Sequence, residues 1–180
     1  MTETGKKQAQ NLKNVLKNIK WDAIYACPLK RTLATAEIIK GEGQCPIIPI
    51  DALKEMSFGQ WEGKLHQDIA QNEALKFEAF WQRPDEYIAG SGEDFFEVEE
   101  RVIRELKRII KAHPTGNILL VIHTVIVKII IGLFRRTGNG SPLESANNPT
   151  GFFMQGRNIR GKSKNSITRG RISFWIGVAK

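Results

Sequence analysis

The chain has 180 residues and a mass of 20.3 kDa, which is enough for one domain with a sizeable core. Apolar residues make up 41% and charged residues 26% of it, and these values exclude a collagen, a bare coiled coil and a fully disordered chain. Two cysteines do not make a disulfide scaffold. They fit a reducing compartment, so we expect a cytoplasmic protein.

The net charge of +8 belongs to the C-terminal quarter of the chain. Residues 1–131 hold 18 Lys and Arg against 18 Asp and Glu, whereas residues 132–180 hold nine against Glu144 alone. We therefore divide a single domain, 1–180, into a balanced body, 1–131, and a basic segment, 132–180. A nucleic-acid reader usually carries its basic patch in the folded body, so a nucleic-acid partner is the less favoured interpretation. It would act through Arg157, Arg160, Lys162, Lys164, Arg169 and Arg171.

The most apolar stretch, 118–134, predicts a buried strand followed by a buried helix. His123 and Lys128 interrupt it, and it is short for a bilayer span. Met1 leads directly into polar residues without the apolar region of a secretory signal. We expect no membrane association.

The spacing of apolar residues predicts helices and strands in alternation. In chain order we predict a helix over 3–20, a strand over 22–26, helix 28–39, strand 47–50, helix 66–79, helix 95–113, strand 117–122, helix 125–134 and a hairpin over 167–178 that turns at 169–171. Pro49 indicates that the second strand lies at a sheet edge. The alternation is typical of an α/β fold with a mostly parallel sheet.

Arg31 is the first candidate for a functional residue. It follows the strand 22–26 at the start of a helix, and ligands of parallel sheets bind at the carboxyl ends of strands. A helix N-terminus there favours an anion, and a guanidinium can bind phosphate oxygens in a bidentate manner. The alternative is an arginine on a solvated helix face.

Glu55 is the second candidate. It lies between apolar residues in a loop punctuated by Gly59 and Gly63. A carboxyl group in an apolar site can keep its proton near neutral pH and act as a general acid. The alternative is an ordinary glutamate in a surface loop.

His123 is the third candidate, and Thr124 follows it. His123 comes directly after the strand 118–122 and precedes a helix, so it can bind phosphate or stabilise developing charge at the same strand-end crevice. The alternative is a core histidine with its hydrogen bonds satisfied. No spacing of His, Cys, Asp and Glu in the sequence suggests a metal site, and we expect neither a metal nor a cofactor.

Four segments together resemble the histidine phosphatase superfamily, also called phosphoglycerate mutase-like. Each is similar to a family motif in order, spacing and context, and together they cover about residues 2–131. The four segments are Thr4–Ala9, Ala26–Glu37, Leu53–Gly63 and Ile118–Thr124.

The resemblance implies a three-layer α/β/α sandwich and a phosphomonoester hydrolase that works through a phosphohistidine. It implies that Arg31 clamps the phosphoryl oxygens, that Glu55 protonates the leaving oxygen and that His123 stabilises the transferring group. Thr124 joins Arg31 and His123 in binding a small phosphorylated substrate. The family carries specificity in the variable region 61–94, so the sequence does not name the substrate.

The sequence departs from the family at the nucleophile. The family's Arg-His-Gly motif lies on an internal strand before the first helix, and no Arg-His-Gly occurs in this sequence. We expect an open strand position beside the strand 118–122 and little or no catalysis by this chain. A truncated gene, a misplaced start codon or real loss would each explain the difference. A non-catalytic binder of phosphate esters is the alternative function.

Overall fold

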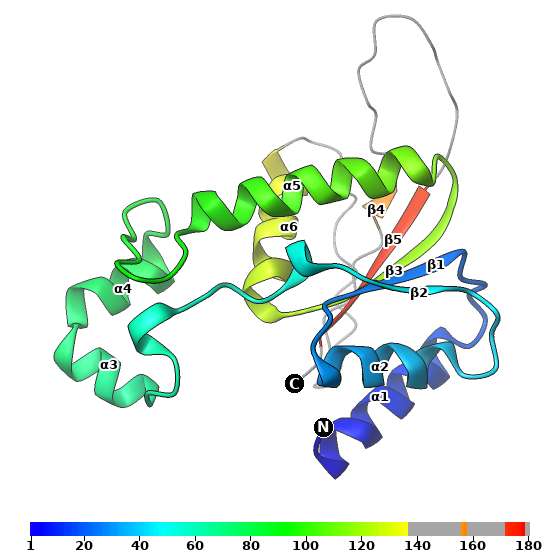
Figure 1. The fold of residues 1–180 in the computed structure, drawn as a ribbon, viewed down its shortest axis with the longest axis horizontal. Coiled ribbons are helices and arrows are strands. Elements are labelled where there is room, and N and C mark those ends of the chain that lie inside the picture. The colour runs from blue at the N-terminus through cyan, green and yellow to red at the C-terminus, as the bar shows by residue number, and fades with distance from the viewer. Residues whose placement is uncertain (137–155, 158–171, 179–180) are drawn as a thin grey trace, which may run out of the picture.

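The structure is a computed structural model that describes residues 1–136, 156–157 and 172–178. Its helices, strands and 3-10 turns follow in chain order: α1 (Glu3–Leu16), β1 (Ala23–Ala26), α2 (Lys30–Lys40), β2 (Ile47–Pro49), η1 (Asp51–Leu53), η2 (Gly59–Trp61), α3 (His66–Asn72), α4 (Ala74–Gln82), α5 (Phe95–Ala112), β3 (Gly116–Ile122), α6 (Thr124–Arg136), β4 (Gly156–Arg157) and β5 (Ile172–Val178). Figure 1 shows their arrangement.

The strands form one sheet in the order β2-β1-β3-β5-β4. β1 runs parallel to β2 and β3, β3 runs parallel to β5, and only β4 pairs antiparallel among the described residues. The predicted α/β fold with a mostly parallel sheet is confirmed. β2 lies at the edge of the sheet, as Pro49 indicated, because proline lacks the N–H that a central strand would donate.

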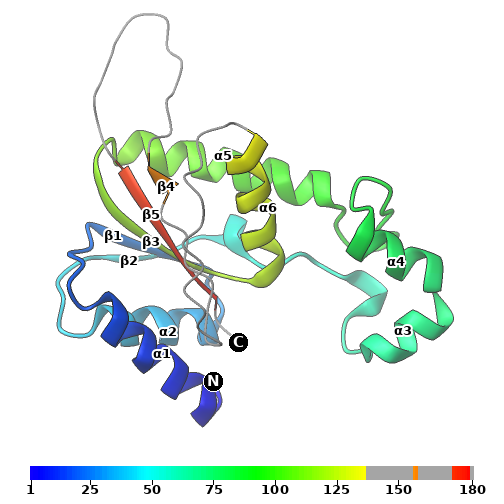
Figure 2. The same ribbon diagram turned by 180° about the vertical axis from the view of Figure 1, so that it is seen from behind.

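Helices cover both faces of the sheet and complete a three-layer sandwich. α1 and α2 lie on one face and α5 and α6 on the other (Figures 1 and 2). Alternate residues of each strand point to opposite faces, so Ile24 and Leu119 join the core under α1 and α2, whereas Tyr25 and Leu120 join the core under α5 and α6. Both faces of the central strands are therefore buried.

The strand position beside β3 is filled, so our expectation of an open position there is wrong. β5 pairs with β3 in parallel over seven residue pairs, from Gly116 with Ile172 to Ile122 with Val178. The backbone N–H and C=O groups of β3 thus face strands on both sides, which avoids the cost of unpaired buried groups. Sequence reasoning had assigned 172–178 only to a hairpin and had not placed it beside β3.

Two predicted helices differ in length from those observed. The helix expected over 3–20 ends at Leu16, and Val15 in its last turn is 59% exposed. The helix expected over 66–79 is two helices, because the backbone of Glu73 leaves the helical region with φ −135° and ψ 46° between α3 and α4. Local apolar spacing does not reveal such a break.

The excursion 61–94, which holds α3 and α4, extends beyond the end of the sheet (Figure 1). Buried aromatic rings hold it together, with Trp61, Phe80 and Tyr87 in mutual contact at ring-centroid distances of 5.2–5.9 Å. Such edge and tilted pairs contribute beyond their buried area. These rings continue the core that lies between the sheet and the helices α5 and α6.

Part of the basic segment 132–180 lies outside the described residues. The turn predicted at 169–171 and five of the six basic residues named for a nucleic-acid contact are among them. Over the residues that the structure describes, no helix is both long and apolar enough to cross a membrane. The same residues contain no group of three His, Cys, Asp or Glu side chains that could hold a metal ion.

Candidate active site

Two helix N-termini meet at one edge of the sheet. β1 ends at Ala26 and leads into α2 at Lys30, and β3 ends at Ile122 and leads into α6 at Thr124. Because β1 and β3 are adjacent and parallel, their carboxyl ends lie side by side, and the N-termini of α2 and α6 approach this edge from opposite faces of the sheet (Figures 1 and 2). The free N–H groups at such helix starts attract an anion.

Arg31 and His123 meet at this edge, as the sequence predicted. Arg31 Nη2 lies 3.3 Å from His123 Nδ1, although the residues are 92 positions apart. The turn before Arg31 is fixed by buried Thr32, whose hydroxyl donates to the carbonyl oxygens of Cys27 and Leu29 at 2.7 Å. The Arg31 side chain itself is exposed, so its remaining N–H groups can reach a ligand.

His123 is a buried histidine held in its neutral form. Its exposed fraction is 2%, and burial together with the nearby Arg31 charge lowers its pKa from 6.5 to about 4. Because Arg31 donates to Nδ1, the neutral ring carries its proton on Nε2. Nε2 has no hydrogen-bond partner among the described residues.

An unpartnered buried N–H is costly, and it is rare in folded proteins. The alternative of a core histidine with satisfied hydrogen bonds is therefore wrong for Nε2. A donor kept in this state next to an arginine and two helix N-termini has the chemistry of an anion site. The group that it suits is a tetrahedral oxyanion such as phosphate.

Glu55 reaches the same site from the loop after η1. Its Oε2 accepts from the N–H of Val125 at 3.4 Å, in the first turn of α6, and its Oε1 accepts from Met56 N at 3.1 Å. Burial raises the pKa of the Glu55 carboxyl, while the N–H groups of Met56, Val125 and Ile126 and the charge of Arg31 oppose the rise. The structure thus brings Arg31, Glu55 and His123 together.

The other predicted residues lie as follows. Thr124 is the first residue of α6, and its side chain is exposed, so its role in binding stays a prediction. His113 hydrogen-bonds through Nε2 to the Tyr25 hydroxyl at 2.9 Å, and His66 packs edge-on against Phe77. These two histidines therefore have structural partners elsewhere.

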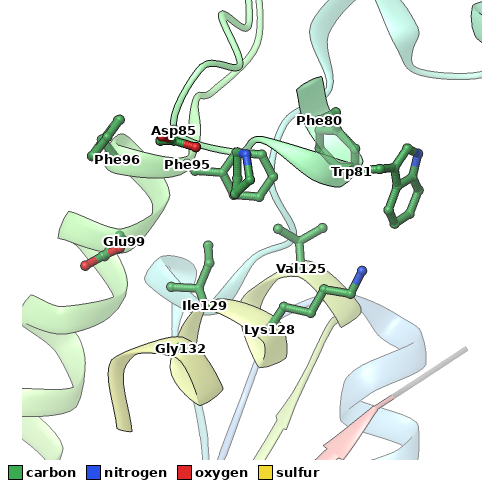
Figure 3. A pocket seen from close by; sticks show the side chains of 11 residues that line it. Phe80, Trp81, Asp85, Phe95, Phe96, Glu99, Val125, Lys128, Ile129 and Gly132 are labelled. Carbon is green, nitrogen blue, oxygen red and sulfur yellow. The ribbon is translucent and has the colours of Figure 1, made fainter. Parts of the chain in front are cut away.

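A cavity of about 310 Å³ opens between α4, α5 and α6. Its walls are mainly aromatic and aliphatic, and Phe80, Trp81 and Phe95 stand above α6 in Figure 3. Lys128 of α6 extends toward Trp81, with Nζ 4.5 Å from the ring centroid. Val125 lines the cavity and also donates its N–H to Glu55, so the cavity adjoins the acid.

Two residues that support Glu55 escaped sequence reasoning. Arg101 of α5 donates to the carbonyl oxygens of Ala52 and Lys54 at 2.6 and 3.0 Å and forms an ion pair with Glu93 at 2.7 Å. Arg101 lies beside the apolar stripe of an amphipathic helix and resembles any solvent-facing arginine in the sequence. Only the packing of α5 against the loop 52–57 reveals its role.

A family model of the histidine phosphatase superfamily (branch 1) matches residues 1–151. Among curated proteins, the adenosylcobalamin/alpha-ribazole phosphatase of Escherichia coli is 32% identical over 131 residues, which cover 73% of this chain and 64% of that protein. Phosphoserine phosphatase 1 of Hydrogenobacter thermophilus is 32% identical over 125 residues, covering 69% of this chain and 59% of its own length. The chain thus spans less than two thirds of these relatives.

Solved structures share the fold. Bacillus stearothermophilus YhfR superposes with a TM-score of 0.77 at 30% identity and covers 94% of this chain and 84% of its own. The alpha-ribazole phosphatase from Shigella flexneri superposes with a TM-score of 0.70 at 29% identity, with 88% of this chain and 78% of its own covered. The phosphoglycerate mutase-like architecture expected from the sequence is confirmed.

Proposed function

The chain belongs to the histidine phosphatase superfamily, and from that membership we propose that Arg31 and His123 bind the phosphate group of a small phosphomonoester and that Glu55 is placed to protonate its leaving oxygen. The unpartnered Nε2–H of buried His123 carries this proposal. The relatives of this chain are named as phosphatases of alpha-ribazole and phosphoserine, and these names support a phosphoric monoester as the substrate class.

In the proposed complex, Arg31 and His123 would hold the phosphoryl oxygens. The guanidinium would donate paired, charge-assisted hydrogen bonds, and His123 would donate from Nε2. The N-termini of α2 and α6 would add partial positive charge on the same side. Phosphoryl transfer depends mainly on such positioning and charge stabilisation.

Glu55 would act as the general acid. Burial favours its protonated form, and a neutral carboxylic acid can donate its proton to the ester oxygen as an incoming nucleophile bonds to phosphorus and the P–O bond to that oxygen breaks. The step would leave a Glu55 carboxylate and a neutral alcohol. General acid catalysis of this kind contributes about 10²–10⁴-fold to a rate.

We further propose that the 180 residues do not turn over a phosphomonoester by themselves. The sequence holds three histidines; His66 and His113 pack against other residues, and His123 would serve as a donor. We expect negligible hydrolysis of para-nitrophenyl phosphate. Robust hydrolysis that disappears in Arg31→Ala would contradict this and identify a nucleophile at the same site.

The organic part of the substrate would lie in the cavity beside Glu55. Its walls include Phe80 and Trp81 from the excursion 61–94, the region in which the family resemblance places specificity. Aromatic and aliphatic walls favour an apolar or aromatic leaving group over a small charged one such as serine. Phenyl phosphate should therefore bind this chain more tightly than O-phosphoserine.

A titration with inorganic phosphate, followed by tryptophan fluorescence or calorimetry, tests phosphate binding. We expect saturation in the millimolar range or below. Arg31→Ala should weaken binding about 10- to 100-fold, the effect of losing charge-assisted hydrogen bonds worth roughly 1.5–3 kcal/mol. Arg108→Ala is the matched control, because Arg108 pairs with Glu105 on the exposed face of α5. Equal affinity in all three proteins would refute the proposed site.

A further inference from the structure

The loop that carries Glu55 is held from behind by a single arginine. Arg101 has five N–H groups, and the structure gives five hydrogen bonds for them. Nε donates to Oε1 of Glu93 at 2.7 Å, and Nη2 donates to Oε2 of the same carboxylate at 2.9 Å. The others reach the carbonyl oxygens of Ala52, Lys54 and Glu55 at 2.6, 3.0 and 3.4 Å.

Glu93 continues the same connection on the other side of the loop. Its Oε2 accepts from Ser57 N at 2.9 Å, and its own N–H donates to the Ser57 carbonyl oxygen at 2.9 Å. Ser57 lies two residues after Glu55, so the segment 52–57 is bonded on both flanks of the acid. Arg101 and Glu93 are 16% and 29% exposed, so water competes only weakly for these bonds.

The two segments cross so closely that only glycine fits at the crossing. A Cβ on Gly92 would lie 2.4 Å from the Ser57 carbonyl oxygen, and a Cβ on Gly59 would lie 2.5 Å from Gly92 N. Gly59 also has φ +55°, a conformation that favours glycine. This contact fixes the height of the loop over the strand ends.

We propose that Arg101 and Glu93 are positioning residues that hold the Glu55 carboxyl against the N-terminus of α6. The inference rests on the proposed role of Glu55 as the general acid. Arg101 bonds to backbone oxygens at and before Glu55, and Glu93 bonds to Ser57 after it, whereas the carboxyl group points away toward Val125. Neither residue touches the phosphate side of the site, so both act through Glu55.

The position matters because burial of the carboxyl group is the largest cause of the raised pKa of Glu55. A loop that moved outward would expose the carboxyl group to water and remove the largest cause of its raised pKa. A lysine at position 101 retains the charge and loses the planar fork that bonds several oxygens at once. Arg101→Lys therefore tests geometry at constant charge.

The experiment is a titration of the Glu55 carboxyl carbon by NMR in protein labelled with ¹³C at glutamate, with Glu55→Gln to assign the signal. We expect Arg101→Lys to lower the pKa of Glu55 toward its ordinary value, because the carboxyl group becomes more exposed to water. Arg108→Lys is the matched control. Arg108 lies on the same helix as Arg101 and also binds a glutamate, Glu105, but its hydrogen bonds to described residues reach no residue of the loop 52–57. Arg108→Lys should leave the titration unchanged.

An Arg101→Lys protein that folds, by circular dichroism and urea unfolding, and that titrates like wild type would overturn the inference. If Arg101→Lys does not fold, Glu93→Gln provides the same test, because glutamine keeps the shape of the Glu93 side chain and removes the charge that pairs with Arg101. Phosphate affinity is measured in parallel. Failure of wild type to bind phosphate would refute the proposed function, whereas an unshifted Glu55 with normal phosphate binding would refute only this inference.

Discussion

His123 shows how burial selects a protonation state at the scale of one residue. Its pKa is lowered to about 4 because the ring is buried and because Arg31 lies beside it. The charged ring would repel Arg31, and the neutral ring accepts a hydrogen bond from it. The same arrangement leaves Nε2–H as a donor at neutral pH.

This shift makes the stability of the protein depend on pH. The unfolded state takes up a proton near pH 6.5 and the folded state near pH 4, so the His123 contribution is present above pH 6.5 and is lost as pH falls to 4. Between pH 7 and pH 4.5, we expect the free energy of unfolding to fall by roughly 1–3 kcal/mol more in wild type than in His123→Gln. Urea unfolding at both pH values measures the difference. A wild type and a His123→Gln protein with the same pH dependence would contradict the assigned environment.

The three candidate site residues could be predicted from the sequence because each lies within a short segment that resembles a family motif. Arg31, Glu55 and His123 each have neighbours that resemble family segments, and the structure brings all three together. Arg101 and Glu93 could not be predicted, because their partners lie in another part of the chain and are mostly backbone carbonyl oxygens. No residue pattern in the sequence reports which carbonyl groups a helix will meet.

At the scale of elements, the crossing of the loops 57–60 and 91–93 sets where the acid stands. Gly59 and Gly63 both have positive φ, at 55° and 78°. A Cβ at Gly59 meets backbone of the other loop, whereas a Cβ at Gly63 meets nothing within 4 Å. A comparison of substitutions at the two glycines therefore separates the cost of steric crowding from the cost of backbone strain.

We expect Gly59→Ala to destabilise the protein by about 1–3 kcal/mol more than Gly63→Ala. Both variants carry the cost of alanine in the left-handed region, roughly 1–2 kcal/mol, and only the first must also push the loops apart. Urea unfolding of the two variants measures the difference. Equal losses of stability would show that the loops yield without cost and that the crossing does not fix the loop.

Secondary structure was predictable to different degrees for physical reasons. α5 was predicted to within one residue at its C-terminal end, because its apolar stripe is regular and Asp94 and Glu97 form a capping box at its start. The break between α3 and α4 was not predicted, since Ile69 of α3 and Phe80 of α4 pack into the same core and give no local signal of the break. Tertiary packing decided the second case.

At the scale of the whole molecule, the sheet is completed from a distance in sequence. β3 and β5 are separated by α6 and by a long segment that includes β4, yet they pair along their full lengths. Sequence reasoning treated the place beside β3 as open because the resemblance assigned it to a strand that this sequence does not hold. Parallel pairing with a later strand cannot be read from local residue patterns, since the register depends on the sheet as a whole.

Hydrogen exchange tests this completion of the sheet. If β5 lies beside β3, the backbone amides of both strands should be protected, including those of residues 172–178. The same amides in the urea-unfolded protein provide the unprotected reference. Rapid exchange throughout 172–178, with half of the β3 amides also unprotected, would contradict the five-stranded sheet.

The phosphate site is the central claim of this account, and ¹⁵N NMR of the histidine side chains during a titration with inorganic phosphate tests it most directly. We predict that the His123 Nε2 resonance shifts and saturates in wild type, while His66 and His113 stay in place. In Arg31→Ala the same shift should require at least about 10-fold more phosphate. A His123 resonance that does not move, in a protein that remains folded, would contradict the assignment of this edge of the sheet as a phosphate-binding site.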